Sequence, residues 1–352
     1  VAGVIPRLEP TGEISAILGE PRTSDVYAIR DSVVVQLPVA ELMEAMQHFP
    51  EAMLRLTRII AMRLRRNAHR QAMASARHSG SLAIIPATPN VPARAIAEAL
   101  CKALAAHSEP ELLDAASVDA ALGAGASTVP PQDVDGNARV VEYLNALETL
   151  LSHLVYLANP EADPWARRCM AQADRILLVV DARDSPGASP MLDAIKRSGV
   201  RAPIDLIVVR PEGCDAGSVF EWRERAGATS HFFVRPGVAA DFASVARQIS
   251  ARGLGIVLGG GGARGFAHIG LLRALRELKM PIDIIGGTSM GAFFSGLLAC
   301  GHDLDSLRSV ARDTFVTHNY LNDYVLPSVS LIRGRKFVRR LHDIFGEQQI
   351  ED

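Results

Sequence analysis

The 352-residue chain has a formal net charge of −2, with 22% charged and 5% aromatic residues. This balance gives no reason to expect a nucleic-acid surface, and the length predicts two or three domains. No Cys-x-x-Cys pair occurs, so we expect neither a zinc site nor a disulfide framework, and a reducing, cytoplasmic compartment fits best. The four scattered cysteines are Cys101, Cys169, Cys214 and Cys300. The first residue is Val1 rather than Met, so we expect a piece of a longer protein.

The N-terminal region, residues 1–74, begins with a pattern typical of β structure and then becomes helical. Ser24–Ile29 and Ser32–Leu37 are short β-rich runs separated by a turn. From Val39 to about Gln71 the apolar residues recur at helical spacing, and the chain then reaches a polar linker at residues 75–81. Arginines crowd the end of this region, where a solvated helix end is preferred to an anionic-lipid patch; they are Arg63, Arg65, Arg66 and Arg70.

A candidate ligand-binding segment precedes the β-rich runs. It begins with Gly12-Glu13, continues through a short predicted helix, and ends in Pro-Arg-Thr-Ser at Ser24. This order resembles the phosphate-binding cassette of cyclic-nucleotide-binding domains. The resemblance implies that Glu13 accepts a hydrogen bond from a ribose hydroxyl and that Arg22 pairs with a cyclic phosphate beside Thr23 and Ser24. The alternative is a surface pair in a β-roll that no longer binds nucleotide.

Residues 81–251 alternate between strand and helix patterns, which predicts a Rossmann-like parallel α/β sheet. The predicted strands are Leu82–Ile85, Ile176–Val180, Ile204–Val209 and His231–Val234. The predicted helices are Ala93–Ala105, Ala138–Leu151, Met191–Arg197 and Asp241–Ser250, and Leu122–Gly136 is expected to be an exposed loop. The first loop, residues 86–92, contains no Gly-Lys-Ser/Thr, so nucleotide hydrolysis is not expected there.

The third region, residues 252–352, contains two glycine-rich turns that each follow an apolar strand. Gly255–Leu258 leads into a glycine loop and then into a helix at Phe266–Leu278. Ile282–Ile285 leads into Gly287-Thr288-Ser289-Met290-Gly291. In a parallel sheet both turns lie at the same edge, so a serine hydroxyl and a row of backbone amides are expected to face each other.

This pairing predicts acyl transfer. Ser289 is the candidate nucleophile, and its neighbours Gly287, Thr288, Met290 and Gly291 form the tight turn that exposes it. The amides of the glycine loop are the candidate oxyanion hole. That loop comprises Gly260, Gly261, Gly262, Ala263, Arg264 and Gly265. No metal site and no cofactor are predicted.

Three other interpretations are weighed for this region and not preferred. The glycine loop also satisfies Gly-x-Gly-x-x-Gly with Asp283 ~18 residues on, as in a dinucleotide site. There, however, the acid should end the second strand, whereas Asp283 stands at the start of one. His268 could act as a base, although a packed or capping histidine is preferred. Residues 284–301 are uncharged, but the glycines beside Ser289 interrupt any membrane-spanning helix.

The two turns resemble those of the patatin-like phospholipases, which use a serine–aspartate dyad. The order of a cyclic-nucleotide-binding-like segment, an α/β region and this domain resembles neuropathy target esterase and its bacterial relatives. Leu321–Tyr324 and Ser330–Phe337 look like that subgroup's sequence after the serine turn. The resemblance implies a patatin-like parallel sheet, a phospholipid or lysophospholipid substrate and transient contact with a membrane from the cytoplasm.

The general base is missing from the pattern. The family's aspartate stands in a downstream Asp-Gly-Gly or Asp-Gly-Ala, and neither occurs between Ser289 and Asp352. The 352 residues are therefore expected to lack the dyad aspartate and to be nearly inactive on their own. The alternative function is a cyclic-nucleotide-responsive binding or scaffold protein with an inert hydrolase domain. Five aspartates lack the following glycine and are expected to be helix caps or solvated surface: Asp303, Asp305, Asp313, Asp323 and Asp343.

Overall fold

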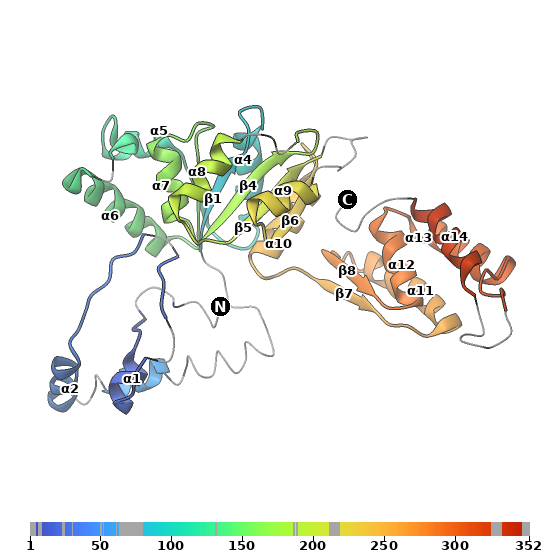
Figure 1. The fold of residues 1–352 in the computed structure, drawn as a ribbon, viewed down its shortest axis with the longest axis horizontal. Coiled ribbons are helices and arrows are strands. Elements are labelled where there is room, and N and C mark those ends of the chain that lie inside the picture. The colour runs from blue at the N-terminus through green and yellow to red at the C-terminus, as the bar shows by residue number, and fades with distance from the viewer. Residues whose placement is uncertain are drawn as a thin grey trace.

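The structure is a computed structural model of the chain. It describes residues 5, 9–22, 25–29, 31–49, 51, 53–60, 62, 80–130, 132–185, 187, 189–210, 219–324 and 333–346. The described elements form two groups, one around a six-stranded sheet and one around a two-stranded sheet, preceded by short N-terminal helices (Figure 1).

The six-stranded sheet is parallel throughout, with the strand order β2-β3-β1-β4-β5-β6. Its strands are β1 (Gly80–Pro86), β2 (Pro110–Leu113), β3 (His153–Leu157), β4 (Arg175–Asp181), β5 (Ile204–Val209) and β6 (Ser230–Val234). The central strands β1, β4 and β5 are almost wholly buried. Strands of a parallel sheet covered on both faces read as continuous apolar runs, and this is the pattern the sequence shows.

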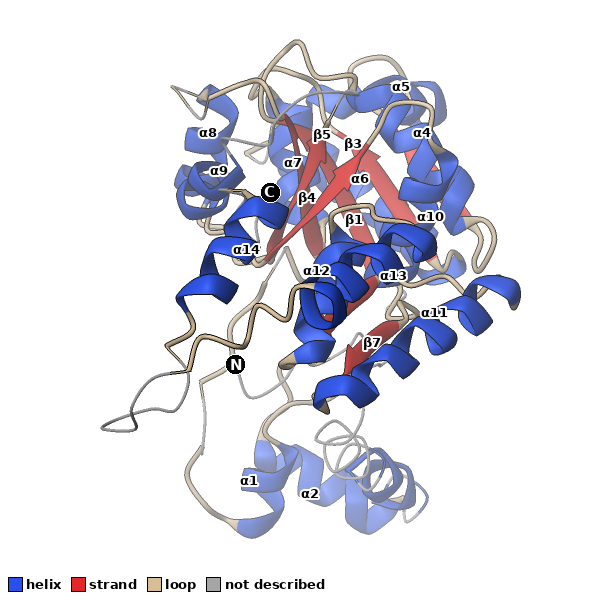
Figure 2. Cartoon of the chain, turned by 90° about the vertical axis from the view of Figure 1, so that its right-hand side faces the viewer, coloured by secondary structure: helices blue, strands red, loops and turns tan. Residues whose placement is uncertain are grey.

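Helices cover both faces of this sheet (Figures 1 and 2). One face packs against α4 (Ala93–Leu104) and α10 (Ala239–Ile249). The other packs against α5 (Ala115–Leu122), α6 (Val134–Leu150), α7 (Pro164–Gln172), α8 (Pro190–Ser198) and α9 (Val219–Ala226). Trp165 and Trp222, the two tryptophans of the chain, are both buried in this second layer. The predicted parallel α/β sheet of this region is therefore present, and its strand order 2-3-1-4-5-6 differs from the 3-2-1-4-5-6 order of a Rossmann fold.

Two of the six strands and three of the helices are absent from the sequence prediction. β2 is only four residues long and contains Pro110 and Glu111, which are poor strand formers. Part of the expected loop 122–136 is structured, because a 3₁₀ turn forms at Ala126–Thr128 and α6 begins at Val134. Asp133 caps α6 by accepting a hydrogen bond from the Gly136 amide at 3.0 Å, so the loop prediction is wrong at its C-terminal end.

The two-stranded sheet pairs β7 (Gly255–Leu258) with β8 (Ile284–Gly287) in parallel. Between them run a 3₁₀ turn at Gly262–Phe266 and α11 (Ala267–Glu277); α12 (Met290–Ala299) follows β8. α13 (Leu304–Arg312), a π-helical turn at Asp313–Thr317 and α14 (Arg335–Phe345) pack onto the same core. The predicted strand–loop–helix order is present, with β8 starting two residues later than expected.

The N-terminal segment contains α1 (Glu13–Leu18), α2 (Val39–His48) and further helical residues at 53–60. No strand occurs among its described residues 25–29 and 31–38, so the predicted β-rich runs are not confirmed. A strand needs a hydrogen-bonded neighbour, and the three valines at 33–35 are instead 83–93% exposed. The segment does touch the larger sheet unit: Tyr27 lies 4.3 Å from Arg201 in a cation–π contact. The arginines at 63–70 lie outside the described residues.

Within the part of the chain that the structure describes, no helix combines the length and apolarity needed to cross a bilayer. The uncharged run from residue 284 to 301 is divided between β8 and α12.

Candidate active site

Ser289 occupies the turn between β8 and α12 in a backbone conformation that L-residues rarely adopt. Its φ is 53° and its ψ is −122°, and it stands directly before the first residue of α12. Such conformations cost about 1–3 kcal/mol and persist only where the surrounding structure enforces them. The turn leaves Ser289 exposed. The strained, exposed serine at a strand-to-helix junction is the geometry of a nucleophile elbow.

Gly287 and Gly291 flank the turn, and at both positions neighbouring backbone atoms leave no room for a Cβ. A Cβ on Gly291 would overlap the carbonyl group of Leu258. A Cβ on Gly287 would lie 2.5 Å from the carbonyl carbon and oxygen of Gly291. The Thr288 amide donates to the Leu258 carbonyl oxygen at 3.0 Å, which fastens the turn to the end of β7. Each glycine of Gly-x-Ser-x-Gly therefore meets a specific steric requirement.

The glycine loop lies against the serine turn. A Cβ built on Gly260 would stand 3.2 Å from Cβ of Ser289 and 3.4 Å from the Thr288 carbonyl oxygen. A Cβ on Gly265 would overlap the buried side chain of Met290, so this glycine lets the first turn of α12 approach the loop. Gly262 has a φ of 55° and Arg264 is exposed at the surface of the loop. The structure thus brings the predicted nucleophile and the predicted oxyanion segment into contact.

His268 supports the glycine loop from the first turn of α11. Its Nε2 lies 2.8 Å from the Gly259 carbonyl oxygen, and its ring stacks edge-on against Phe294 at 6.2 Å between centroids. The imidazole is therefore held by the loop backbone, as the packed or capping interpretation expects.

Asp283, directly before β8, has a buried carboxylate that accepts several hydrogen bonds. Arg247 of α10 donates to both oxygens, at 2.6 Å from Nη2 to Oδ1 and 3.0 Å from Nε to Oδ2. The Ser244 hydroxyl and the Leu254 amide also donate, at 2.7 and 2.9 Å. Burial raises the pKa of Asp283, but these hydrogen bonds outweigh that effect and leave the pKa lowered. A carboxylate so occupied is not available for a nucleotide ribose, which argues against the dinucleotide alternative.

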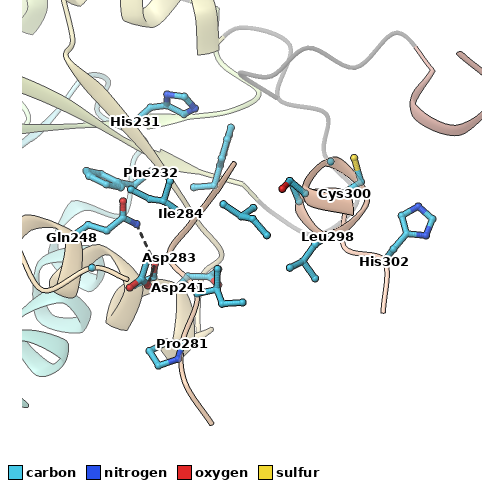
Figure 3. A pocket seen from close by; sticks show the side chains of 18 of the residues that line it. His231, Phe232, Asp241, Gln248, Pro281, Asp283, Ile284, Leu298, Cys300 and His302 are labelled. Carbon is cyan, nitrogen blue, oxygen red and sulfur yellow. Dashed lines mark hydrogen bonds between the residues drawn. The ribbon is translucent and has the colours of Figure 1, made fainter. Parts of the chain in front are cut away.

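An open cavity of about 2260 Å³ lies between β6 and α10 on one side and β8, α12 and α14 on the other. Ser289 lines it together with apolar side chains, among them Ile284, Phe293 and Leu298. Figure 3 shows Phe232 and Gln248 near Asp283 on one side, and Leu298, Cys300 and His302 on the other. The serine turn therefore opens onto a space large enough for an extended apolar ligand.

Two family models match consecutive parts of the chain. Residues 78–252 match the model described as the Neuropathy Target Esterase family P-loop like domain, and residues 256–352 match the model for patatin-like phospholipase. The chain thus contains a P-loop-like domain of the neuropathy target esterase family followed by a patatin-like phospholipase domain. We refer below to the matched segments as the P-loop-like domain and the patatin-like domain.

Curated relatives align with nearly the whole chain. Patatin-like phospholipase domain-containing proteins 6 and 7 of Mus musculus are each 28% identical, over 97% and 100% of this chain. Neuropathy target esterase sws of Drosophila grimshawi is also 28% identical, over 97% of this chain. The alignments cover 28%, 29% and 26% of those proteins, so the chain spans little more than a quarter of their length.

Solved structures of plasmid partition proteins from Borrelia burgdorferi resemble the chain more distantly. The alignment with one of them covers 49% of this chain and 96% of the partition protein, at 14% identity and with a TM-score of 0.34. Another, bound to AMPPNP, covers 44% and 86% at 16% identity, with a TM-score of 0.31. Likeness at this level supports no inference about the function of this chain.

The P-loop-like domain of this patatin-like protein has a first loop unlike a phosphate cradle. Three backbone N–H donors are missing here, because Pro86 ends β1 and Pro89 and Pro92 lie between β1 and α4. The Thr88 hydroxyl donates to a carboxylate oxygen of Asp184 at 3.0 Å. The Ala87 carbonyl accepts a hydrogen bond from the buried Ser189 hydroxyl at 2.7 Å. Both hydrogen bonds tie the loop to other parts of the same domain, and the expectation that this loop does not hydrolyse nucleotides stays a prediction.

The candidate cyclic-nucleotide segment is partly described. Glu13 begins α1 and is 4% exposed, whereas Arg22 is exposed. Gly12 has a φ of 85°, and a Cβ there would overlap the Arg22 guanidinium, so Arg22 folds back onto the glycine. Thr23 and Ser24 lie outside the described residues. Binding of a cyclic nucleotide at this segment stays a prediction.

Carboxylates that follow Ser289 in the patatin-like domain have structural partners. Asp303 caps α13 by accepting from the Ser306 amide at 2.8 Å. Asp313 pairs with Arg340 at 2.8 Å, and Asp323 accepts from the Lys336 amide at 3.3 Å. The expectation that these three aspartates serve as caps and surface groups agrees with this geometry.

The residues that sequence reasoning missed are Arg247 and Ser244. They stand on α10, about 40 residues before the carboxylate that they bind, and no pattern along the chain links the two positions. The sequence offered one indication of a buried partner, the charged Asp283 directly before an apolar strand.

Proposed function

We propose that the chain provides the nucleophile and oxyanion site of a serine esterase that hydrolyses acyl esters of phospholipids or lysophospholipids. The observation that supports this most directly is the contact between the glycine loop at Gly260 and the strained, exposed Ser289. A hydroxyl and a set of backbone amides beside one another are the two groups that acyl transfer requires.

In the proposed reaction the Ser289 Oγ attacks the ester carbonyl carbon. Its proton passes to a general base while the carbonyl oxygen becomes an oxyanion, which the amides of residues 260–263 stabilise. The bond from the carbonyl carbon to the alcohol oxygen then breaks, and the base returns the proton to the leaving lysolipid or glycerophosphoryl group. Water attacks the acyl-enzyme by the same route and releases the fatty acid.

Among the described residues, neither His268 nor Asp283 is available as the general base. His268 is held by the Gly259 carbonyl, and Asp283 is enclosed by Arg247 and Ser244. We infer that an aspartate of an Asp-Gly-Gly or Asp-Gly-Ala segment outside the 352 residues completes a serine–aspartate dyad. The 352-residue chain alone is then expected to hydrolyse esters very slowly.

The substrate class follows from the surroundings of Ser289. The cavity onto which it opens is lined by charged side chains such as Arg276 and also by aliphatic and aromatic ones, including Ile285, Phe293 and Leu298. The apolar part of this lining favours burial of a hydrocarbon chain, at about 0.8 kcal/mol per buried CH₂. The names of the relatives, patatin-like phospholipase and neuropathy target esterase, support an acyl ester of a phospholipid over a water-soluble ester.

The proposal is tested on the full-length protein. A fluorophosphonate probe and release of fatty acid from lysophosphatidylcholine measure the nucleophile and the reaction. We expect Ser289→Ala to abolish labelling and to lower hydrolysis by at least ~10³-fold, because the variant lacks the hydroxyl proposed to form the acyl-enzyme. Ser309→Ala, at an exposed serine of α13, is the control and should retain both.

Absence of probe labelling in the full-length wild-type protein would overturn the esterase proposal. Rapid ester hydrolysis by the 352-residue chain that Ser289→Ala abolishes would overturn only the part that places the general base outside these residues. The two outcomes are therefore distinguishable.

A further inference from the structure

The P-loop-like domain and the patatin-like domain are joined by a very short connection. α10 ends at Ile249 and β7 begins at Gly255, with the Arg252 amide donating to the Arg247 carbonyl oxygen at 2.7 Å on the way. The last turns of α10 consequently stand next to the start of the β7–β8 pair. Ser244 and Arg247 are the residues of α10 that reach across to Asp283.

The contacts of Asp283 join three segments at one point. Its carboxylate binds Ser244 and Arg247 of α10 and the Leu254 amide at the start of β7. Its own amide donates to the Leu254 carbonyl oxygen at 2.9 Å. Asp283 thus fixes the start of β7 to the start of β8 and fixes both to the P-loop-like domain. We call Ser244, Arg247 and Asp283 the α10–β8 joint.

Burial distinguishes this joint from an ordinary surface ion pair. The side chain of Asp283 is 0% exposed and that of Arg247 is 20% exposed. The Arg235–Asp241 pair in the same domain has the same two-point geometry, but its arginine side chain is 55% exposed and both partners belong to the P-loop-like domain. Exposed ion pairs contribute little to folding stability. Removing one member of a buried pair is strongly destabilising, because it leaves the other charge buried without a partner.

A short rigid path leads from the joint to the nucleophile. β8 begins one residue after Asp283, pairs with β7 over its whole length, and ends two residues before Ser289. The amide of Thr288 is then bonded to Leu258 at the end of β7. No loop lies between the start of β8 and the serine turn, so a displacement of the start of β8 is expected to move Ser289 as well.

From this arrangement we infer that Arg247 is a positioning residue for Ser289: the α10–β8 joint lets the P-loop-like domain hold the nucleophile-bearing strand in register. This inference rests on the proposed esterase function for its kinetic consequence, although not for its structural one. It gives the P-loop-like domain a role that needs no nucleotide.

Hydrogen exchange of the 352-residue chain tests the joint without relying on catalysis. In Arg247→Met the amides of residues 254 and 283–288 should exchange at least ~10-fold faster, with β1 to β6 unchanged. Arg235→Met is the matched control and should leave residues 283–288 as in the wild type. Fluorescence of the buried Trp165 and Trp222 reports whether the P-loop-like domain is still folded. Should Arg247→Met fail to fold, Ser244→Ala removes one donor with little change in volume, and the same local increase is expected.

Inactivation kinetics of the full-length protein test the effect on Ser289. The maximal rate of fluorophosphonate labelling should fall about 10- to 100-fold in Arg247→Met with the probe's half-saturating concentration unchanged, since misplacement of a reacting group by about 1 Å has an effect of this size. Arg247→Lys should restore part of the rate, and Arg235→Met should match the wild type. Unchanged exchange at residues 283–288, or equal slowing in both arginine variants, would overturn the inference. If the wild type is not labelled at all, the esterase proposal fails. The hydrogen-exchange experiment still tests whether the α10–β8 joint holds β8 in place.

Discussion

Individual glycines of the patatin-like domain differ sharply in what a side chain would meet. At Gly291 a Cβ would overlap the Leu258 carbonyl group, so the close approach of α12 to the end of β7 depends on this position. At Gly270, inside α11, a Cβ would meet no atom within 4 Å. One glycine is therefore required by packing, whereas the other leaves a helix interior more flexible than alanine would.

The two glycines give opposite predictions for the same substitution. Gly291→Ala should lower the free energy of unfolding by about 1–3 kcal/mol, because inserting an atom into a filled space forces the backbone apart. Gly270→Ala should raise it by about 0.5–1 kcal/mol through reduced freedom of the unfolded chain. Urea unfolding followed by far-UV circular dichroism measures both. Changes of the same sign in the two variants would contradict this account of the serine turn.

Elements, rather than single residues, determine where the two strands of the patatin-like domain lie. β7 and β8 form only one strand pair, and two-stranded sheets are marginal unless they pack on something else. Here α11, α12 and α13 supply the core on one side, and Asp283 ties the start of the pair to α10. The ionisation of one carboxylate therefore affects how firmly a whole element is attached.

Asp283→Asn should make the stability of the protein less dependent on acidic pH. The folded-state pKa of Asp283 is lowered below the ~3.9 of an unfolded aspartate, so its contribution is full above about pH 4 and is lost as pH falls through the lower folded value. At pH 7 we expect the variant to be about 3 kcal/mol less stable, because Arg247 loses its partner.

Urea titrations at pH 7, 5, 4 and 3 measure this difference, which should shrink below pH 4. Asp343→Asn, at an exposed position of α14, is the control and should show a difference near zero throughout. A difference between wild type and Asp283→Asn that stays constant down to pH 3 would show that the carboxylate is not stabilised as described.

The element scale also shows how far the sequence alone could lead. Long apolar runs such as Ile176–Val180 identified the buried parallel strands, and Gly-x-Ser-x-Gly identified the serine turn. Pro110–Leu113 was missed because four residues with a proline and a glutamate carry little strand signal. The Arg247–Asp283 contact could not be predicted, since residues 36 positions apart are brought together only by the packing of α10 beside β8.

At the scale of the whole molecule, protection from solvent is concentrated in the P-loop-like domain. Its two cores cover both faces of a six-stranded sheet, whereas the N-terminal residues 31–38 are exposed and belong to no helix or strand. Val33, Val34 and Val35 have the composition of a strand, but in the part of the chain described here they have no strand beside them.

This contrast predicts a wide range of hydrogen-exchange rates within one chain. Amides of residues 33–35 should exchange within seconds, while those of β1, β4 and β5 should be the slowest, because they lie in the middle of the sheet and are buried. Mass spectrometry of peptides from labelled protein measures both sets. Strong protection at residues 33–35 would indicate instead that the predicted β-rich run pairs in solution.

The backbone angles of Ser289 imply a conflict between durability and chemistry. Glycine would adopt a φ of 53° and a ψ of −122° with less strain than any residue bearing a Cβ. Selection for heat resistance alone would therefore tend to replace the serine with glycine. Retaining the hydroxyl at this position means accepting a less robust fold in exchange for a reactive group.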